Sequence, residues 1–535
     1  MPHRHTHSRP PSWSTLFPYS TDHPPEWKLP KYSPRSGDEK PSHGWVDEHT
    51  AASPTPGVEH FWHRYGKLVA AVLATTTLVS TMFTAMLLLS QPDSLQLVKE
   101  FLPATHSLGE SSLPLPTATD ASETEIFEQP ETIMSEEVEY KAYIGQFLMD
   151  APGESFEDNL RSEHQYITSW PSAGWTNDVM TYANLIHLAL LTSRIPILPP
   201  FAPSHLPQEA GFPPVGEVFD IPRLSKAIGI PILEWKDVKR QDSDDWEVLG
   251  CWSTWSTWQD SHRPSYVLPR LKLDVSYTGL PDDFKLFHDN PNDYHVSLNK
   301  LVQLAFPSGR NAALVQHQPV AAQRSGLTIE PSEHLLCYDY LYYTGVDTAF
   351  EWWYDWSPQW RFVGTHMHWT PRVEGIAKEY LMNHFGTNDV DSVPPYIVVH
   401  ARRGDFLGQC ATQDMTCLPT HSQMKRRVLE MQSSLAAQGI QTDRVLVTSD
   451  ETDPTWWEAI TEMGYTYINH TELGTEAKYG MWYGPILDAA FQSMGAAVIG
   501  TERSTMSLLA ERRALDWQSA PSTRLTFSNV PGEDN

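Results

Sequence analysis

The second half of this chain alternates short apolar segments with segments of helical spacing, and this alternation limits the possible folds more than any other feature. The apolar runs predict strands at 396–400, 444–448, 465–469 and 496–500, and the segments that follow them predict helices at 420–438, 454–463, 485–494 and 504–512. Four strand and helix pairs in about 120 residues are typical of a doubly wound α/β domain with a parallel sheet. The sequence therefore predicts such a domain over 371–535, with a helix at 371–384 opening it.

An earlier part of the chain shows the same kind of unit once. A strand at 166–170 is followed by a loop of small residues, a helix at 178–192 and a second strand at 194–199. This order is the building block of a parallel sheet. We therefore expect a second Rossmann-like domain over 141–370.

The middle of the chain, 202–370, is dense in Trp and Pro and is assigned to the rest of the first domain with long insertions. The densest stretches are CWSTWSTWQD at 251–260 and EWWYDWSPQWRF at 351–362. Tryptophan rings can stack on sugar rings. The alternative is that they fill the core between the two domains, and the sequence favours this second interpretation.

The stretch Tyr396–Phe406, YIVVHARRGDF, places two arginines directly after a strand without charges. Ligands of parallel sheets bind beyond the carboxyl ends of the strands. Guanidinium groups present forks of donors that match phosphate oxygens two at a time. Arg402 and Arg403 are therefore predicted to bind a diphosphate, and the alternative is a structural salt bridge with Asp405 or Asp450.

Other predicted strand ends carry polar residues at the same relative place. Ser504 and Thr505 would also open the last helix, where free backbone N–H groups favour an anion; without a ligand they would act as a helix cap. The loop that follows the strand at 166–170 is a second candidate contact surface, because small residues let the backbone approach a ligand. The candidate residues at these places are His400, Asp405, Asp450, Gly500, Thr501, Arg503, Ser504 and Thr505, with Gly174 to Asn177 in the loop.

Together these residues resemble the superfamily of GDP-fucose-dependent fucosyltransferases, which includes protein O-fucosyltransferases and α1,6-fucosyltransferases. HARRGDF is similar to that family's H-x-R-x-G-D motif, GWTND at 174–178 to its G-x-x-N-Q loop, and GTERSTMS at 500–507 to its C-terminal Ser/Thr motif. Asp178 stands where many members have Gln. The resemblance covers about 165–200 and 370–512, leaving out the Trp-rich middle.

The resemblance implies a GT-B architecture, two Rossmann-like domains with the sugar nucleotide between them, and an inverting transfer without a metal. It implies that Arg402 or Arg403 offsets charge on the departing β-phosphate and that Ser504 and Thr505 bind phosphate oxygens. His400 and Asp488 are implied to lie near the guanine. Asn177 and Asp178 are predicted to act on the acceptor side, with Asp178 as a candidate base, and no cofactor is implied besides the donor GDP-fucose.

One motif is at odds with a transfer without a metal. Asp242-Ser243-Asp244 matches the pattern by which paired carboxylates hold a divalent cation against a diphosphate. It follows a polar run, WKDVKRQ, rather than an apolar strand. A solvated, charged loop is therefore the favoured interpretation.

The first 140 residues do not resemble a folded domain. Residues 1–66 are rich in Pro, His and Ser and predict a disordered tail, and 91–140 predicts a flexible stalk rich in Ser, Thr, Pro and Glu. Between them, Leu68 to Leu89 has no charge, Pro or Gly, and as a helix it would be about 33 Å long, enough for a hydrocarbon core of about 30 Å. We expect a transmembrane signal anchor at 67–90; a buried core helix is the weaker alternative.

Arg64 and Lys67 precede this segment, while Asp93 is the first charge after it. The positive-inside rule then places the tail in the cytosol and the head in the lumen of the Golgi or ER. All four cysteines, at 251, 337, 410 and 417, lie in the predicted head, as expected in an oxidising compartment. We favour the pairs Cys410 with Cys417 and Cys251 with Cys337 over a zinc site. The sequon at Asn469 fits a lumenal location.

With 66 acidic and 38 basic residues, the chain has a net charge of −28, which argues against nucleic acid as a partner. The predicted partners are a GDP-sugar donor, a protein or glycan acceptor and a membrane. Competing readings are a transferase for another nucleotide sugar and an inactive, membrane-anchored binding protein. An adhesion role for Arg403-Gly404-Asp405 is disfavoured because the tripeptide directly follows a buried strand.

Overall fold

The computed structural model describes residues 131–290, 293–409 and 417–527, which belong to one compact unit. The predicted tail, the predicted membrane segment and most of the predicted stalk lie outside these residues. No helix within the described ranges has the length and apolarity needed to cross a membrane. The stalk prediction extends too far, because helix α2 (Glu131–Ile144) already covers its last residues and Tyr140 is anchored by a hydrogen bond from its hydroxyl to the Ile232 carbonyl.

The first sheet has six strands in the order β3-β2-β1-β7-β4-β5, and every pair of neighbours runs parallel. The predicted strands after residue 165 are confirmed as β1 and β2, and the Trp-rich middle supplies the others. The strands are β1 (Tyr166–Ser169), β2 (Ile195–Leu198), β3 (Leu233–Glu234), β4 (Glu247–Ser253), β5 (Leu273–Gly279) and β7 (Leu335–Tyr338).

The second sheet is also entirely parallel, with the order β10-β9-β11-β12. Its strands are β9 (Ile397–Ala401), β10 (Val445–Ser449), β11 (Ala497–Thr501) and β12 (Ser522–Leu525). The first three confirm predictions. The strand predicted at 465–469 is wrong: this segment forms only an isolated bridge between Thr466 and Leu446 of β10, and the fourth strand is β12, at the opposite edge of the sheet.

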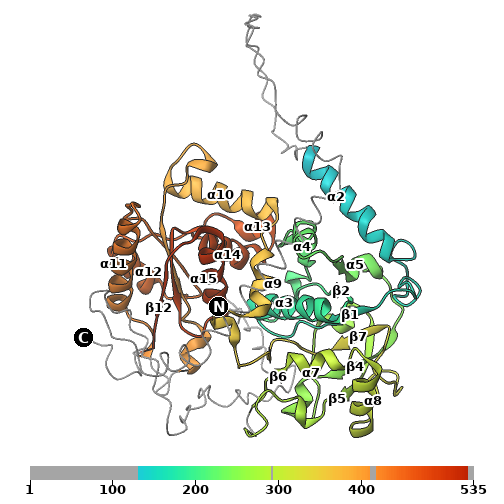
Figure 1. Ribbon diagram of the computed structural model, residues 1–535. Coiled ribbons are helices and arrows are strands. Elements are labelled where there is room, and N and C mark those ends of the chain that lie inside the picture. Colours follow the sequence, from blue (N-terminus) through green and yellow to red (C-terminus); the bar gives the residue numbers. More distant parts are fainter. Residues whose placement is uncertain (1–130, 291–292, 410–416, 528–535) are drawn as a thin grey trace, which may run out of the picture. The chain divides into compact units, whose positions relative to one another are not determined.

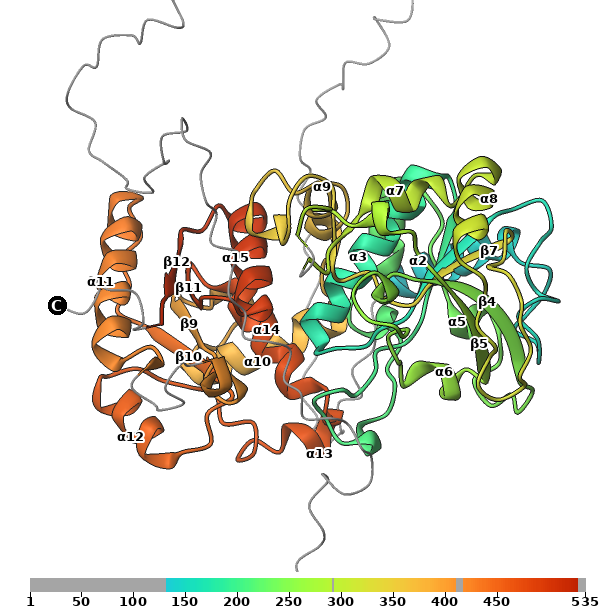
Figure 2. The same cartoon turned by 90° about the horizontal axis from the view of Figure 1, so that it is seen from below.

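Helices cover both faces of the second sheet, and Figures 1 and 2 show α11 and α12 on one side with α14 and α15 on the other. Alternate residues of β9 follow this division. Ile397 and Val399 pack with α11 (His421–Ala437) and α12 (Pro454–Glu462), whereas Val398 packs in the core that contains α14 (Tyr483–Met494) and α15 (Thr505–Gln518). The doubly wound arrangement predicted from the sequence is therefore confirmed for this sheet.

The core that contains α14 and α15 continues into the first sheet. Its buried residues include residues of β1, α3 (Trp175–Thr192) and α10 (Pro371–Phe385). Two indole groups from the segment before α10 add polar contacts to α14 and α15: Trp369 donates to Ser493 Oγ at 2.9 Å, and Trp360 donates to Asp516 at 2.6 Å. Within this unit the two sheets thus share a core. The remaining elements are α4 (Ile221–Ile228), α5 (Trp235–Val238), α6 (Val267–Arg270), α7 (Leu298–Gln303), α8 (Pro307–Gln316), α9 (Pro358–Phe362), α13 (Thr475–Tyr479), β6 (Val296–Ser297) and β8 (Thr344–Gly345).

Local sequence explains where the main helices begin. Thr370, Thr420, Asp453 and Ser504 each accept a hydrogen bond from a backbone N–H of the first turn of α10, α11, α12 and α15. Such caps stabilise a helix by about 1 kcal/mol. Since a helix in a parallel α/β sheet starts after a strand's carboxyl end, three of these caps also mark the edge of the second sheet where polar residues gather.

The tryptophans of the middle segment divide between core and surface. Trp252, Trp352 and Trp360 are at most 1% exposed, which confirms the core interpretation for them. Trp356 is 45% exposed and stacks on Tyr354, with ring centroids 5.3 Å apart. Sugar stacking stays a prediction for the tryptophans of this segment that are not buried.

One predicted disulfide is present. Cys251 in β4 and Cys337 in β7 are bonded across neighbouring strands, and both side chains are fully buried. Cys417 is disulfide-bonded as well, while Cys410 lies outside the described residues.

Candidate active site

Arg402 occupies the first position after β9, and two carboxylates hold its guanidinium group. Its Nε and Nη2 bond Asp405 Oδ1 at 3.0 and 2.9 Å, and its Nη1 lies 3.1 Å from Asp450 Oδ2. The salt bridge offered as the alternative reading is therefore present with both partners. These contacts use three of the five N–H donors of the side chain and leave two for a ligand. The side chain is 26% exposed, so a ligand can reach it.

Arg403 has a different environment, although it is the next residue. Its Nε donates to Glu451 at 2.6 Å, its guanidinium lies 5.1 Å from the centre of the Trp456 ring, and its side chain is only 10% exposed. Trp456 belongs to α12, on the face of the sheet that α11 and α12 cover. Arg403 is thus less exposed than Arg402, and Arg402 is the more accessible of the two arginines.

Asp450 links the two loops that carry these residues. One of its oxygens accepts the Arg403 backbone N–H at 2.8 Å, while the other pairs with Arg402. The close approach requires glycine at 404, because a Cβ there would lie 2.5 Å from Asp450 Oδ2. This contact explains the Gly of the HARRGDF motif without any ligand.

The N-termini of two long helices meet beside Arg402. At the start of α15, Thr505 Oγ1 donates to Asn177 Oδ1 at 2.7 Å and shares a hydrogen bond of 2.7 Å with Thr176 Oγ1, both in the first turn of α3. Arg402 is tied to the same place, since its backbone N–H donates to Thr501 at the end of β11. Two helix dipoles and one guanidinium group therefore favour an anion at this edge of the two sheets.

Ser504 and Arg503 complete the turn into α15. Ser504 Oγ caps the helix by accepting the Ser507 N–H, and its side chain is buried. Arg503 has a left-handed backbone with φ of 66°, which is a strained conformation for a residue other than glycine. Its guanidinium lies 5.4 Å from the centre of the Phe527 ring. The predicted phosphate contacts of these residues stay predictions.

Gly174 is the residue before α3 and has a histidine against it. A Cβ at this position would lie 3.0 Å from Nε2 of His205, so any larger residue would push the ring slightly away. His205 comes from the loop after β2 and is exposed to solvent although protein surrounds much of the ring. This crowding and the nearby Arg402 lower the pKa of the imidazole below its usual value, while Asp405 and Asp450 oppose the change.

Asp178 corrects an expectation, since we predicted that it faces the ligand. Its side chain is fully buried, and Oδ1 accepts the backbone N–H groups of Ser172 and Ala173 at 3.0 and 3.1 Å. Burial raises the pKa of this carboxyl well above its usual value. A group without solvent access cannot reach an acceptor hydroxyl, so Asp178 holds the loop before α3 instead of serving as the base.

We expect Asp178→Asn to retain sugar transfer within a few-fold of the wild type, because the amide oxygen can still accept a loop N–H. Asp178→Ala should lower the free energy of unfolding by roughly 2–4 kcal/mol, since it leaves two N–H groups without an acceptor. Urea denaturation and transfer rates measure these effects. If a fully folded Asp178→Asn protein lost 10²-fold or more of its transfer rate, the carboxyl of Asp178 would be the base after all.

His400 and Asp488 are the two residues that the resemblance places near the guanine. The His400 side chain is 3% exposed, and its Nδ1 forms a hydrogen bond of 2.7 Å with Ser507 Oγ in α15. Asp488 in α14 lies 3.0 Å from Nε2 of His470. Neither contact tests the predicted nucleotide contact, which stays a prediction.

Burial, with Arg402 as a second cause, lowers the pKa of His400 to about 4. Since an unfolded His titrates near 6.5, the folded state takes up its proton later than the unfolded chain as the pH falls. The contribution of His400 to the free energy of unfolding is therefore fully present above pH 6.5. It decreases by about 3 kcal/mol as the pH falls toward 4. Urea denaturation at pH 7 and pH 4.5 should show a smaller decrease for His400→Gln; identical decreases in both proteins would contradict this assignment.

The acidic motif at 242–244 lies on an exposed loop. Asp242 and Asp244 are 78% and 95% exposed and pair with Arg240 and Lys272, respectively. This agrees with the interpretation as a solvated, charged loop. In the part of the chain that is described, no group of three or more His, Cys, Asp or Glu side chains could hold a metal ion.

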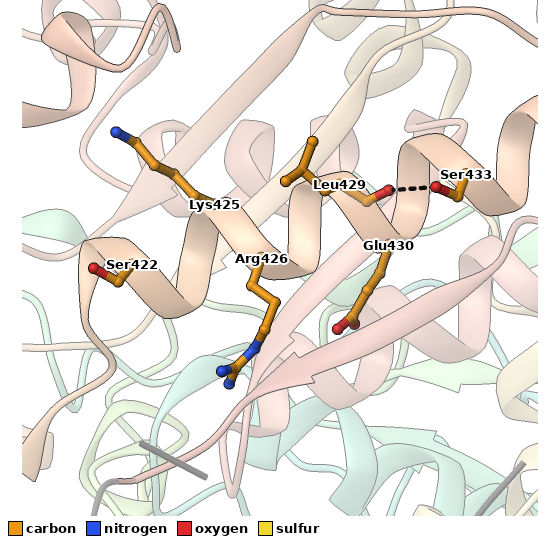
Figure 3. Close-up of a pocket in the computed structure, with 6 residues that line it drawn as sticks. All are labelled: Ser422, Lys425, Arg426, Leu429, Glu430 and Ser433. Carbon is orange, nitrogen blue, oxygen red and sulfur yellow. Dashed lines mark hydrogen bonds between the residues drawn. The ribbon is translucent and has the colours of Figure 1, made fainter. Parts of the chain in front are cut away.

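A surface pocket on α11 lies away from the strand ends. Figure 3 shows its residues along one helix, with Lys425 and Arg426 pointing away from each other and a hydrogen bond from Ser433 to the Leu429 carbonyl. All of its lining residues belong to α11. Because one helix face supplies the whole lining, this pocket has no convergent polar groups and is not a candidate active site.

Sequence reasoning did not single out His205, Glu451 or Ser507. His205 has one usable signal: it lies in the loop after a predicted strand of a parallel sheet, where ligand contacts are expected. Glu451 and Ser507 act through partners in other segments, Arg403 and His400, and a single sequence does not show such pairs.

Comparison with known proteins gives the following. No protein-family model and no curated protein matches the chain. Among solved structures the chain is similar to POFUT1 without ligand, with 16% identity, a TM-score of 0.42 and coverage of 68% of this chain and 99% of that one. It is also similar to POFUT1 in complex with GDP, at 15% identity, a TM-score of 0.43 and 68% and 99% coverage. The fucosyltransferase NodZ from Bradyrhizobium matches at 13% identity and a TM-score of 0.33, with 65% and 93% coverage.

Proposed function

We propose that this chain is a glycosyltransferase that transfers fucose from GDP-fucose to a hydroxyl group of a protein or glycan. The observation that carries the proposal is the position of Arg402, beyond the carboxyl end of β9 and beside the N-termini of α3 and α15. Anions are favoured at such a place for two reasons: the guanidinium group, and the helix N-termini, where unsatisfied backbone N–H groups carry the positive end of the helix dipole. The guanine base and the fucose come from the resemblance of the motifs at 174–178, 400–406 and 500–507.

In the proposed transfer, Arg402 stabilises the leaving group, the β-phosphate of GDP. As the bond from the anomeric carbon to the β-phosphate oxygen breaks, negative charge accumulates on that oxygen, and a preorganised donor lowers the barrier. Asp405 and Asp450 hold the guanidinium in a fixed orientation before the donor binds. In this scheme the acceptor attacks from the opposite face with inversion, and a divalent metal has no part.

We also propose that the protein is anchored in the Golgi or ER membrane with its head in the lumen. The supports are the uncharged segment Leu68 to Leu89, the basic residues that precede it and the disulfide between Cys251 and Cys337.

Calorimetry with the purified full-length protein tests the donor. GDP-fucose and GDP should bind, whereas UDP-sugars should not. Binding of GDP-mannose as tight as that of GDP-fucose would favour the alternative, a transferase of the same architecture for another nucleotide sugar. Activity that survives EDTA supports the scheme without a metal, and activity lost with EDTA and restored by a divalent cation contradicts it.

A further inference from the structure

The proposed transfer needs a group that removes the proton of the acceptor hydroxyl, and most acidic side chains around Arg402 are already in use. Asp405 and Asp450 are paired with Arg402, and Glu451 is paired with Arg403. Asp178 is buried and holds the loop before α3. None of these carboxyl groups is free to accept a proton in the assembled site.

His205 differs from all of them. Within the described part of the chain its imidazole makes no hydrogen bond, yet it lies against the backbone of Gly174 and is exposed to solvent. It comes from the loop after β2 in the first sheet, while the arginine that it neighbours follows β9 in the second sheet. His205 therefore lies where an acceptor hydroxyl bound between the loops of the two sheets could contact it.

We propose that the imidazole of His205 is the general base of the transfer, a role that rests on the proposed function. In the transfer the acceptor oxygen forms a bond to the anomeric carbon of the sugar, and the bond from that carbon to the β-phosphate oxygen breaks. The electron pair of the broken bond remains on GDP. The hydroxyl proton passes to an imidazole nitrogen of His205 and from there to water.

The charge environment suits this role. Burial by the surrounding protein lowers the pKa of His205, and the positive charge of Arg402 lowers it further. Asp405 and Asp450 act in the opposite sense, but the net change is a lower pKa. The ring is then neutral at pH 7 and able to accept a proton. A base with a lowered pKa remains active at mildly acidic pH, where an ordinary His would already be protonated.

Gly174 has a structural role in this scheme. Since a Cβ at 174 would lie 3.0 Å from Nε2 of His205, the glycine leaves room for the ring at the start of α3. Asp178 holds the same loop by accepting the backbone N–H groups of Ser172 and Ala173. Asp178 and Gly174 are thus positioning residues for the base, and His205 is the residue that touches the acceptor.

The test compares His205→Ala and His205→Gln with the wild type and with His288→Ala, a change at another exposed histidine. We expect kcat to fall by roughly 10²-fold or more in both His205 variants. The Kd for GDP-fucose and the thermal unfolding midpoint should stay near the wild-type values, and His288→Ala should match the wild type. The wild-type kcat/KM should fall on the acid side with a pKa below the usual 6.5 of His, and this decrease should vanish in His205→Gln.

Partial recovery of His205→Ala by added imidazole would support the role directly. A folded His205→Gln protein with kcat within a few-fold of the wild type and the same acid limb would overturn it, and so would a loss of activity fully explained by weaker GDP-fucose binding. Wild-type protein that transfers no sugar from any GDP-sugar would overturn the proposed function and this inference with it. Active wild type with equally active His205 variants overturns the role of His205 alone.

Discussion

Replacing Arg402 by Ala is expected to slow sugar transfer by about 10²–10³-fold, the usual cost of losing one preorganised donor at a developing negative charge. The expectation follows from its position beside the N-termini of α3 and α15 and from the two donors that its carboxylate partners leave unused. Arg402→Lys should recover little of the rate, because an ammonium group cannot present the two parallel donors of a guanidinium group. Single-turnover rates with saturating GDP-fucose measure the effect.

Arg403→Ala is the matched control, since it removes the same group one residue later. It leaves Glu451, whose side chain is 12% exposed, without its arginine partner and removes the guanidinium from the Trp456 ring. We expect a lower free energy of unfolding, by roughly 1–3 kcal/mol, and nearly normal transfer in the protein that remains folded. Equal losses of transfer in the two folded variants would show that the arginines do not divide their roles in this way.

Loss of the disulfide between Cys251 and Cys337 is expected to cost about 2–5 kcal/mol of unfolding free energy. The bond closes a segment with a sequence separation of 86 residues, and in the chain-entropy description a cross-link over this length restricts the unfolded chain strongly. The pair also joins β4 to β7 next to Trp252 and Tyr338, the one pair of residues at which these strands are in register. Urea denaturation of the double variants to Ala and to Val checks the prediction.

The Val pair separates the cross-link from packing. Valine fills nearly the space of the buried cysteines, so a deficit caused by the missing covalent bond should be similar in the Ala and Val proteins. A Val protein as stable as the wild type would mean that the two side chains matter through volume alone.

Much of the second sheet could be predicted because its strands carry strong signals. The residues of β9 are apolar apart from His400, and the helices after the strands begin at capping residues such as Thr420 and Ser504. β12 was missed because three of its four residues, Ser522 to Arg524, are polar, and the strand lies at the edge of the sheet. The run at 465–469 has the composition of a strand, but its neighbour β10 pairs with it only at Thr466.

The site was predicted in outline and not in detail. The place of the two arginines followed from the strand that precedes them, but consecutive side chains after a strand diverge. Only contacts with Trp456 and Glu451, which lie in distant segments, show that Arg403 is the more buried of the two. Asp178 was misjudged for a related reason. A carboxyl in the first turn of a helix can face a ligand or bond the loop before it, and the loop N–H groups of Ser172 and Ala173 decide in favour of the second.

The central claim is that Arg402 serves the transfer of a sugar from a GDP-sugar to a hydroxyl acceptor. Incubation of the full-length protein with labelled GDP-fucose and a membrane-protein extract, side by side with Arg402→Ala, tests it most directly. We expect label on a protein or glycan with the wild type, released GDP in equal amount, and at least 10²-fold less label with Arg402→Ala. Equal labelling by both proteins, or no labelling by a wild type that binds GDP-fucose, would contradict it.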